Sequence, residues 1–151
     1  MSMTDFFDDV GKTVQTNAEK RGVELSLQIQ EGYVCIEYDL FKTLILNLID
    51  NALKSGGTNV CVTGICNEQL YEIEVKDNGR GIPPEEIQRI TEAFYMVDKS
   101  RSRKEHGAGL GLALCEKIAS IHSTKLEISS KEGIGTNIRL KLLLSGKAEM
   151  I

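Results

Sequence analysis

The clearest pattern of apolar and polar positions predicts an amphipathic helix between Asp39 and Ser55. Asp39 is expected to cap it and Gly56-Gly57 to end it. Apolar residues recur there at steps of three and four, which leaves one face for burial: Phe41, Leu44, Ile45, Leu48 and Ala52. Another face carries Thr43, Asn47, Asn51 and Lys54. Asn is a poor helix former, because its amide competes for backbone hydrogen bonds. This stripe therefore indicates either a binding face for phosphate and metal or a solvated helix surface.

A first helix is predicted from Thr4 to Lys20, with Gly22 at the place of a C-terminal stop. Its apolar positions follow the helical period: Phe6, Phe7, Val10, Val14 and Ala18. The alternation of Leu25, Leu27 and Ile29 with polar residues is typical of a half-buried strand. Residues 33–36 could form a short partner strand, so we expect a hairpin here.

The second half of the chain predicts two more hairpins and two more helices. The second hairpin joins Asn59–Ile65 to Leu70–Lys76, and the third joins Leu126–Ser129 to Thr136–Leu142 through Gly133 and Gly135. A short helix is expected at 84–94, and a longer one is indicated by Leu110, Leu114, Ile118 and Ile121. The intervening segment 95–108 lacks any period, and segments of this length are usually functional lids or disordered.

The alternation of helices and hairpins favours an α+β fold, a two-layer sandwich whose mixed, mostly antiparallel sheet carries its helices on one face. A chain of 151 residues suits one domain, 1–151, with a core from about 4 to 144.

Composition narrows the classes of function. Apolar residues make up 41% and charged residues 26%, and no apolar run is long enough to cross a bilayer, so we expect no membrane insertion. The net charge of -4 argues against nucleic acid as a partner. The four cysteines are scattered without paired spacing, which favours reduced residues and a cytoplasmic location.

Three glycine-rich stretches in the second half indicate a polyphosphate site. They lie at 77–82 (DNGRGI), 107–112 (GAGLGL) and 133–136 (GIGT). Glycine lets backbone N–H groups approach a ligand closely, and residues 109–112 open a helix whose N-terminus favours phosphate. A dinucleotide fold is excluded because Gly107 follows no predicted strand, and a phosphate-binding P-loop is excluded because no GK[ST] is present.

In this order the motifs resemble the catalytic, ATP-binding domain of sensor histidine kinases in the GHKL superfamily, with its Bergerat-type fold. NLIDNALK at 47–54 is similar to the asparagine box, and DNGRGI is similar to the first glycine box. AFYMVDKSRSR at 93–103 resembles the phenylalanine box and the start of the lid, and GAGLGL and GIGT resemble the remaining glycine boxes. The resemblance spans roughly residues 4–144.

The resemblance implies ATP and Mg²⁺ as cofactors. Asp77 is similar to the carboxylate that accepts a hydrogen bond from the adenine amino group, which guanine could not donate. Asn51 matches the magnesium ligand, Asn47 would support it, and Lys54 would pair with a phosphate. The other positions implied to contact the nucleotide are Gly79, Gly81, Ile82, Phe94, Gly107, Gly109, Leu110, Gly111, Leu112 and Thr136.

The resemblance also implies a transfer of the γ-phosphate to a histidine on another domain. Arg101 or Arg103 of the lid would stabilise charge on the γ-phosphate. His106 and His122 do not resemble a phosphoacceptor site, so the acceptor is expected on a dimerisation domain of the same parent kinase, absent from this chain, with a response regulator downstream. Related chaperones and topoisomerases place a Glu at the position of Asn47, where it activates water, and an amide cannot take that role.

Two alternatives stay open on the sequence. One is a free-standing serine kinase similar to the anti-sigma factors, which typically carry Glu where Asn47 stands. The other is a degenerate domain that binds partners without nucleotide, against which Asn51, Asp77 and the glycine stretches count. The sequence departs from the family pattern at two places. Ser55-Gly56-Gly57 follows Lys54, where an aromatic residue or His is often found, and Ser123-Thr124 stands where Gly-Gly is usual.

Overall fold

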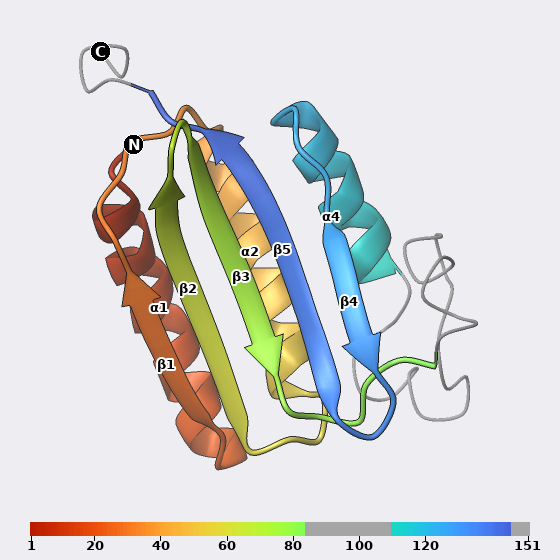
Figure 1. Cartoon of the computed structure of the whole chain (residues 1–151). Helices are drawn as coiled ribbons and strands as arrows, with labels where there is room; N and C mark the ends of the chain where they lie inside the picture. The colour runs from red at the N-terminus through yellow and green to blue at the C-terminus, as the bar shows by residue number, and fades with distance from the viewer. Residues whose placement is uncertain (84–109, 146–151) are drawn as a thin grey trace.

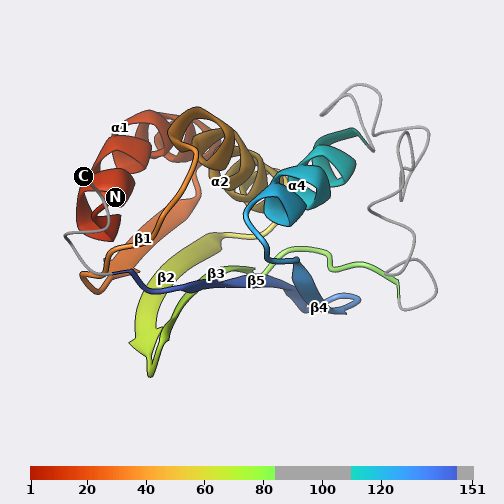
Figure 2. The same ribbon diagram turned by 90° about the horizontal axis from the view of Figure 1, so that it is seen from above.

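A computed structural model describes residues 1–83 and 110–145 and shows a five-stranded sheet with helices on one face (Figures 1 and 2). The elements follow in the order α1 (Met3–Arg21), β1 (Glu24–Ile29), α2 (Tyr38–Leu53), β2 (Asn59–Asn67), β3 (Leu70–Asp77), α4 (Leu110–Ile121), β4 (Glu127–Lys131) and β5 (Gly135–Leu143). The strand order is β1-β2-β3-β5-β4, and only β1 and β2 pair in parallel. The predicted α+β two-layer fold is confirmed.

The predicted first hairpin is wrong. Strand β1 pairs in parallel with β2, which begins only after α2, so β1, α2 and β2 form a strand–helix–strand crossover. Residues 33–36 form no strand, and Tyr33 and Val34 make only isolated bridges to Ser2 and Leu144. Antiparallel neighbours can be joined by a tight turn, whereas a parallel pair needs a crossover of this kind.

The helix ends follow local chemistry. Gly22 ends α1 in the left-handed conformation, at φ +70°, and Ser2 caps its start by accepting the N–H of Asp5. The prediction that Asp39 caps α2 is wrong, because Glu37 occupies the N-cap position and makes no side-chain cap bond. Helix α2 ends at Leu53, just before the predicted Gly-Gly stop.

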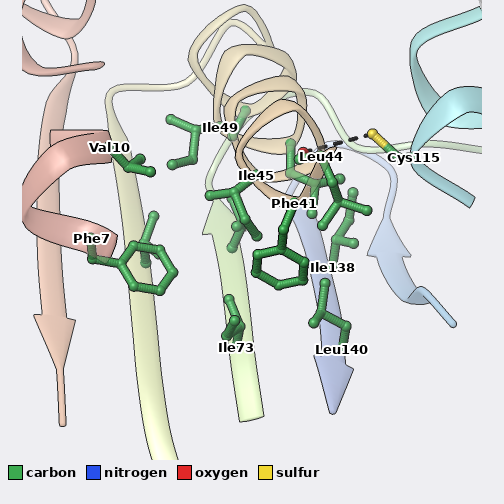
Figure 3. Packing of buried hydrophobic residues seen from close by; sticks show 14 of the residues in the cluster. Phe7, Val10, Phe41, Leu44, Ile45, Ile49, Ile73, Cys115, Ile138 and Leu140 are labelled. Carbon is green, nitrogen blue, oxygen red and sulfur yellow. Dashed lines mark hydrogen bonds between the residues drawn. The ribbon is translucent and has the colours of Figure 1, made fainter. Parts of the chain in front are cut away.

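The core lies between the helices and the inner face of the sheet (Figure 3). All five predicted apolar positions of α1 are buried, and so are all five of α2. Helix α4 is confirmed, but Leu114 and Ile121 are 46% and 63% exposed. Its buried face carries Ile118, as predicted, together with Cys115 and Ala119, and Figure 3 shows Cys115 close to Leu44 of α2.

Candidate functional site

The polar face of α2 presents two asparagines and a lysine. Asn47 and Asn51 are partly buried, and their amides hydrogen-bond to no other residue in the described part of the chain. Lys54, the residue that follows the helix, places its Nζ 2.8 Å from Oδ2 of Asp50. Two partly buried amides without a partner among residues 1–83 and 110–145 are unusual, because such groups are normally hydrogen-bonded. This face is therefore available to a ligand.

Asp50 lies beside the candidate site, and it was not among the residues predicted from the sequence. Its Oδ2 pairs with Lys54, and its Oδ1 accepts a 3.3 Å hydrogen bond from Nδ2 of Asn17 in α1. The spacing of four residues between Asp50 and Lys54 was a signal for this pair. The carboxylate holds the Lys54 ammonium near the helix end, so an incoming phosphate would have to share that cation.

Asp77 ends β3 with its carboxylate partly buried. Its Oδ1 accepts a 2.8 Å hydrogen bond from the N–H of Gly79, which closes an Asx turn. Burial raises the pKa of Asp77 above its ordinary value, while the backbone N–H groups of Gly79 and Thr136 act in the opposite direction. The local turn and a ligand-binding role are thus compatible, since one side chain can serve both.

The glycines of the 77–82 loop permit close approach between segments of the protein itself. A Cβ at Gly79 would lie 2.1 Å from Oγ of Ser55, and one at Gly81, where φ is +73°, would lie 2.3 Å from the carbonyl oxygen of Lys131. The structure therefore gives these two glycines a packing role, whereas the sequence was interpreted in terms of close approach to a ligand. It also shows what the unusual Ser55 does, since its side chain packs directly on the loop.

Hydrogen bonds join this loop to two segments that are remote in sequence. The N–H of Arg80 donates to the carbonyl of Ser55 at the end of α2, at 3.0 Å. The carbonyl of Arg80 accepts the N–H of Gly133, at 2.7 Å, and the N–H of Ile82 donates to Oγ of Ser130, at 2.8 Å. In Figure 1 the end of α2, the loop after β3 and the β4–β5 turn meet at one end of the sheet.

Thr136 faces Asp77 across the sheet. The two residues are direct partners in the antiparallel register of β3 and β5, so their side chains point to the same face. Thr136 is 8% exposed, and its Oγ1 lies 2.8 Å from Oγ of Ser130. Ser130 was also missed, because a single serine in a strand gives no signal until its neighbours in space are known.

Of the glycine stretch at 107–112, the structure describes only residues 110–112. Helix α4 begins at Leu110, as expected, so Gly111 lies in its first turn, and Leu112 packs partly against the core. The first turn of a helix leaves backbone N–H groups unpaired, which suits an anion. The predicted short helix and the predicted lid lie outside the described residues. The same is true of the remaining predicted site residues, which are Phe94, Arg101, Arg103, Gly107 and Gly109.

His122 has a structural place at the end of α4. Its Nε2 accepts the N–H of Glu37 at 2.9 Å, and its Nδ1 lies 2.8 Å from the carbonyl oxygen of Ile118. The ring also packs edge-on against Phe41. The imidazole thus joins the end of α4 to the start of α2. The next residue, Ser123, has φ +58°, so the turn has a left-handed residue at a place where the resemblance leads us to expect glycine.

The oxygen atoms of this site meet the coordination needs of Mg²⁺ without a cluster of acidic side chains in the described residues. Within residues 1–83 and 110–145, no three His, Cys, Asp or Glu side chains gather into a metal site. Mg²⁺ prefers oxygen ligands and keeps several waters, so one protein oxygen with phosphate and water is sufficient. The amide of Asn51, which has no hydrogen-bond partner within the described residues, fits that requirement.

Comparisons with known proteins give a consistent result. Residues 36–146 match the family described as "Histidine kinase-, DNA gyrase B-, and HSP90-like ATPase". Sensor histidine kinase YclK of Bacillus subtilis (strain 168) is 30% identical over 97% of this chain and 32% of its own length. Sensor histidine kinase WalK of the same organism is 38% identical over 78% of this chain and 20% of its own length. The chain therefore spans a third or less of these relatives.

Solved structures show the same fold. The mycobacterial sensor histidine kinase MprB superposes with a TM-score of 0.80 at 24% identity and covers 95% of both chains. The nucleotide-free catalytic domain of histidine kinase ThkA gives a TM-score of 0.77 at 19% identity, covering 95% of this chain and 93% of that one.

Proposed function

The chain belongs to the histidine kinase-, DNA gyrase B- and HSP90-like ATPase family, and from this premise we propose that it is the ATP-binding catalytic domain of a sensor histidine kinase. The observation that carries the proposal is the match of the family model over 36–146 together with relatives that are sensor kinases. The chain would bind Mg-ATP and transfer the γ-phosphate to a histidine on a dimerisation domain of its parent kinase. A response regulator would then receive the phosphate.

In this proposal the base lies at the loop end of the site. The Asp77 carboxylate accepts a hydrogen bond from the adenine amino group, and Gly79, Gly81, Ile82 and Thr136 surround it. The support is geometric, because backbone hydrogen bonds fix this loop against the end of α2 and the β4–β5 turn. A rigid, partly buried acceptor favours a base that offers a donor at that place.

The phosphates would lie along α2 and the start of α4. Asn51 would hold Mg²⁺ through its amide oxygen, with Asn47 in support, and the ion would supply charge for the phosphates. Lys54 and a lid arginine, Arg101 or Arg103, would share the charge that develops on transfer. Phe94 would seat the lid, and Gly107, Gly109, Leu110, Gly111 and Leu112 would line the phosphate side.

The nature of Asn47 determines which acceptor is used. An amide cannot take a proton from water, so hydrolysis should be slow. A neutral imidazole brings its own lone pair, and the domain need only position the γ-phosphate for attack.

The serine-kinase alternative is not favoured, because the relatives matched across the chain are sensor kinases. Among the described helices, none has the length and apolar character that a membrane span requires.

A titration tests nucleotide binding first. Calorimetry should show binding of Mg-ATP with preference over GTP, and Asp77→Ala should abolish it. Asn51→Ala should weaken Mg-ATP binding, whereas Asn137→Ala, on the uncovered face of the sheet, is the matched control and should bind like the wild type. Equal affinity for ATP and GTP, or an unaffected Asp77→Ala, would contradict the adenine assignment.

A transfer assay tests the reaction. The chain, mixed with the histidine-bearing domain of its parent and labelled ATP, should give an acid-labile, base-stable phosphoprotein on that domain. The label should be lost with Asn51→Ala and kept with Asn137→Ala. An acid-stable label on Ser or Thr would favour the serine-kinase alternative. A label on His106 or His122 of the chain alone would contradict the need for a separate acceptor.

A further inference from the structure

The hydroxyl of Ser130 lies where three segments of the candidate site meet. Its Oγ is 2.8 Å from the backbone nitrogen of Ile82, 3.0 Å from the carbonyl oxygen of Gly135 and 2.8 Å from Oγ1 of Thr136. The partners come from the loop after β3 and from the first two residues of β5, and Ser130 itself is in β4. The side chain is partly buried, so these bonds do not compete freely with water.

Counting protons leaves one arrangement that satisfies all three contacts. A serine hydroxyl donates one hydrogen bond and can accept two. The N–H of Ile82 can only donate, so Ser130 accepts there. The carbonyl of Gly135 can only accept, so the single proton of Ser130 is directed to it. The remaining contact must then be made by the proton of Thr136.

This arrangement leaves the Thr136 hydroxyl with only lone pairs to offer to a ligand. Thr136 is the direct cross-strand partner of Asp77, and both side chains point to the same face. The ligand therefore meets two acceptors, a carboxylate and a hydroxyl oxygen. An exocyclic amino group carries two N–H donors and matches them, whereas a carbonyl at the same place of the base offers only lone pairs.

Given the proposed function, we propose that Ser130 is a positioning residue for base selectivity, which acts by fixing the Thr136 hydroxyl as an acceptor. Its bond to Ile82 also fixes the distance between the base-binding loop and β4. Ser130 itself does not touch the nucleotide. Its loss should therefore change the preference between bases more than it changes the affinity for the phosphates.

The test compares ATP with inosine triphosphate, which carries a carbonyl in place of the amino group. Ser130→Ala should lower the ratio of the two affinities about tenfold, the effect of one hydrogen bond of ordinary strength. Ser129→Ala, on the adjacent exposed residue of the same strand, is the matched control and should keep the ratio. In a Thr136→Val background, which has no hydroxyl to orient, Ser130→Ala should have no further effect on the ratio.

Each other outcome refutes a distinct statement. Equal weakening of both nucleotides with an unchanged ratio would show a purely structural role and overturn the proposal. A full effect of Ser130→Ala in the Thr136→Val background would overturn the route through Thr136. A wild-type chain that binds neither nucleotide would refute the proposed function, and the inference would fall with it. If Ser130→Ala does not fold, Ser130→Cys, which fills the same space with a weak hydrogen-bonding group, takes its place.

Discussion

Replacement of Asp77 by Asn tests the base-binding end of the site with almost no change in shape. In the structure, Oδ1 of Asp77 accepts the N–H of Gly79 at 2.8 Å, and an Asn would keep that bond with its own Oδ1. The other carboxylate oxygen then becomes an NH₂ group. A donor would meet the adenine amino group, itself a donor, whereas the carbonyl of a 6-oxopurine would now find a partner.

The magnitude follows from the bond that is lost. A hydrogen bond to a charged group contributes about 1.5–3 kcal/mol, so ATP affinity should fall roughly 10- to 150-fold. The preference should at the same time move toward GTP or inosine triphosphate. Calorimetric titration of the three nucleotides against both proteins measures this directly. If Asp77→Asn retained the wild-type preference for ATP, the carboxylate would not face the base.

The same substitution should alter how stability depends on pH. Burial raises the folded-state pKa of Asp77 above its ordinary value of 3.8, so the stability that this group contributes is present below that value and is lost as the pH rises through the folded-state pKa. An amide does not ionise, so the ligand-free variant should unfold at pH 7 at a temperature no lower than that of the wild type. A clear drop in that temperature would mean that the ionised carboxylate stabilises the fold.

Three further predictions concern stability and reactivity. Hydrogen bonds from Thr4, Ser2 and Gly32 outweigh burial and lower the pKa of Glu31 to about 2. The stability that ionised Glu31 contributes to the fold should therefore be lost as the pH falls from about 4.5 through about 2. Acid unfolding of Glu31→Gln should show a shallower pH dependence than that of the wild type, with Glu132→Gln as control. Glu68 begins the two-residue β2–β3 turn at φ +58°, so Glu68→Gly should stabilise the domain by about 0.5–1 kcal/mol in thermal melts, whereas Glu68→Ala should not. Burial raises the pKa of Cys115 to about 12, so a thiol reagent at pH 8 should modify the exposed Cys35 and Cys66 and reach Cys115 only on unfolding.

The elements that could be predicted from sequence are those whose signal is local. Helices α1 and α2 follow from the apolar period, because each buries one stripe against a single sheet. The first hairpin failed for the opposite reason. The alternation in β1 indicates a half-buried strand but not its neighbour, and that neighbour, β2, begins 30 residues after the end of β1 and pairs with it in parallel. Helix α4 has more apolar residues than its buried face holds, so the apolar pattern alone could not show that Leu114 and Ile121 would be exposed.

The two ends of the candidate site are built on different principles. At the end proposed to bind the base, protein partners already fix the polar groups: Gly79 holds Asp77, Ser130 holds Thr136, and hydrogen bonds tie the loop to α2 and β4. Along α2, the amides of Asn47 and Asn51 have no protein partner within the described residues. A group fixed before binding discriminates between ligands because it cannot adapt, while an unpartnered amide needs the ligand to complete its hydrogen bonds. Selectivity among nucleotides should therefore reside at Asp77 and its neighbours, and dependence on metal and phosphate should reside along α2.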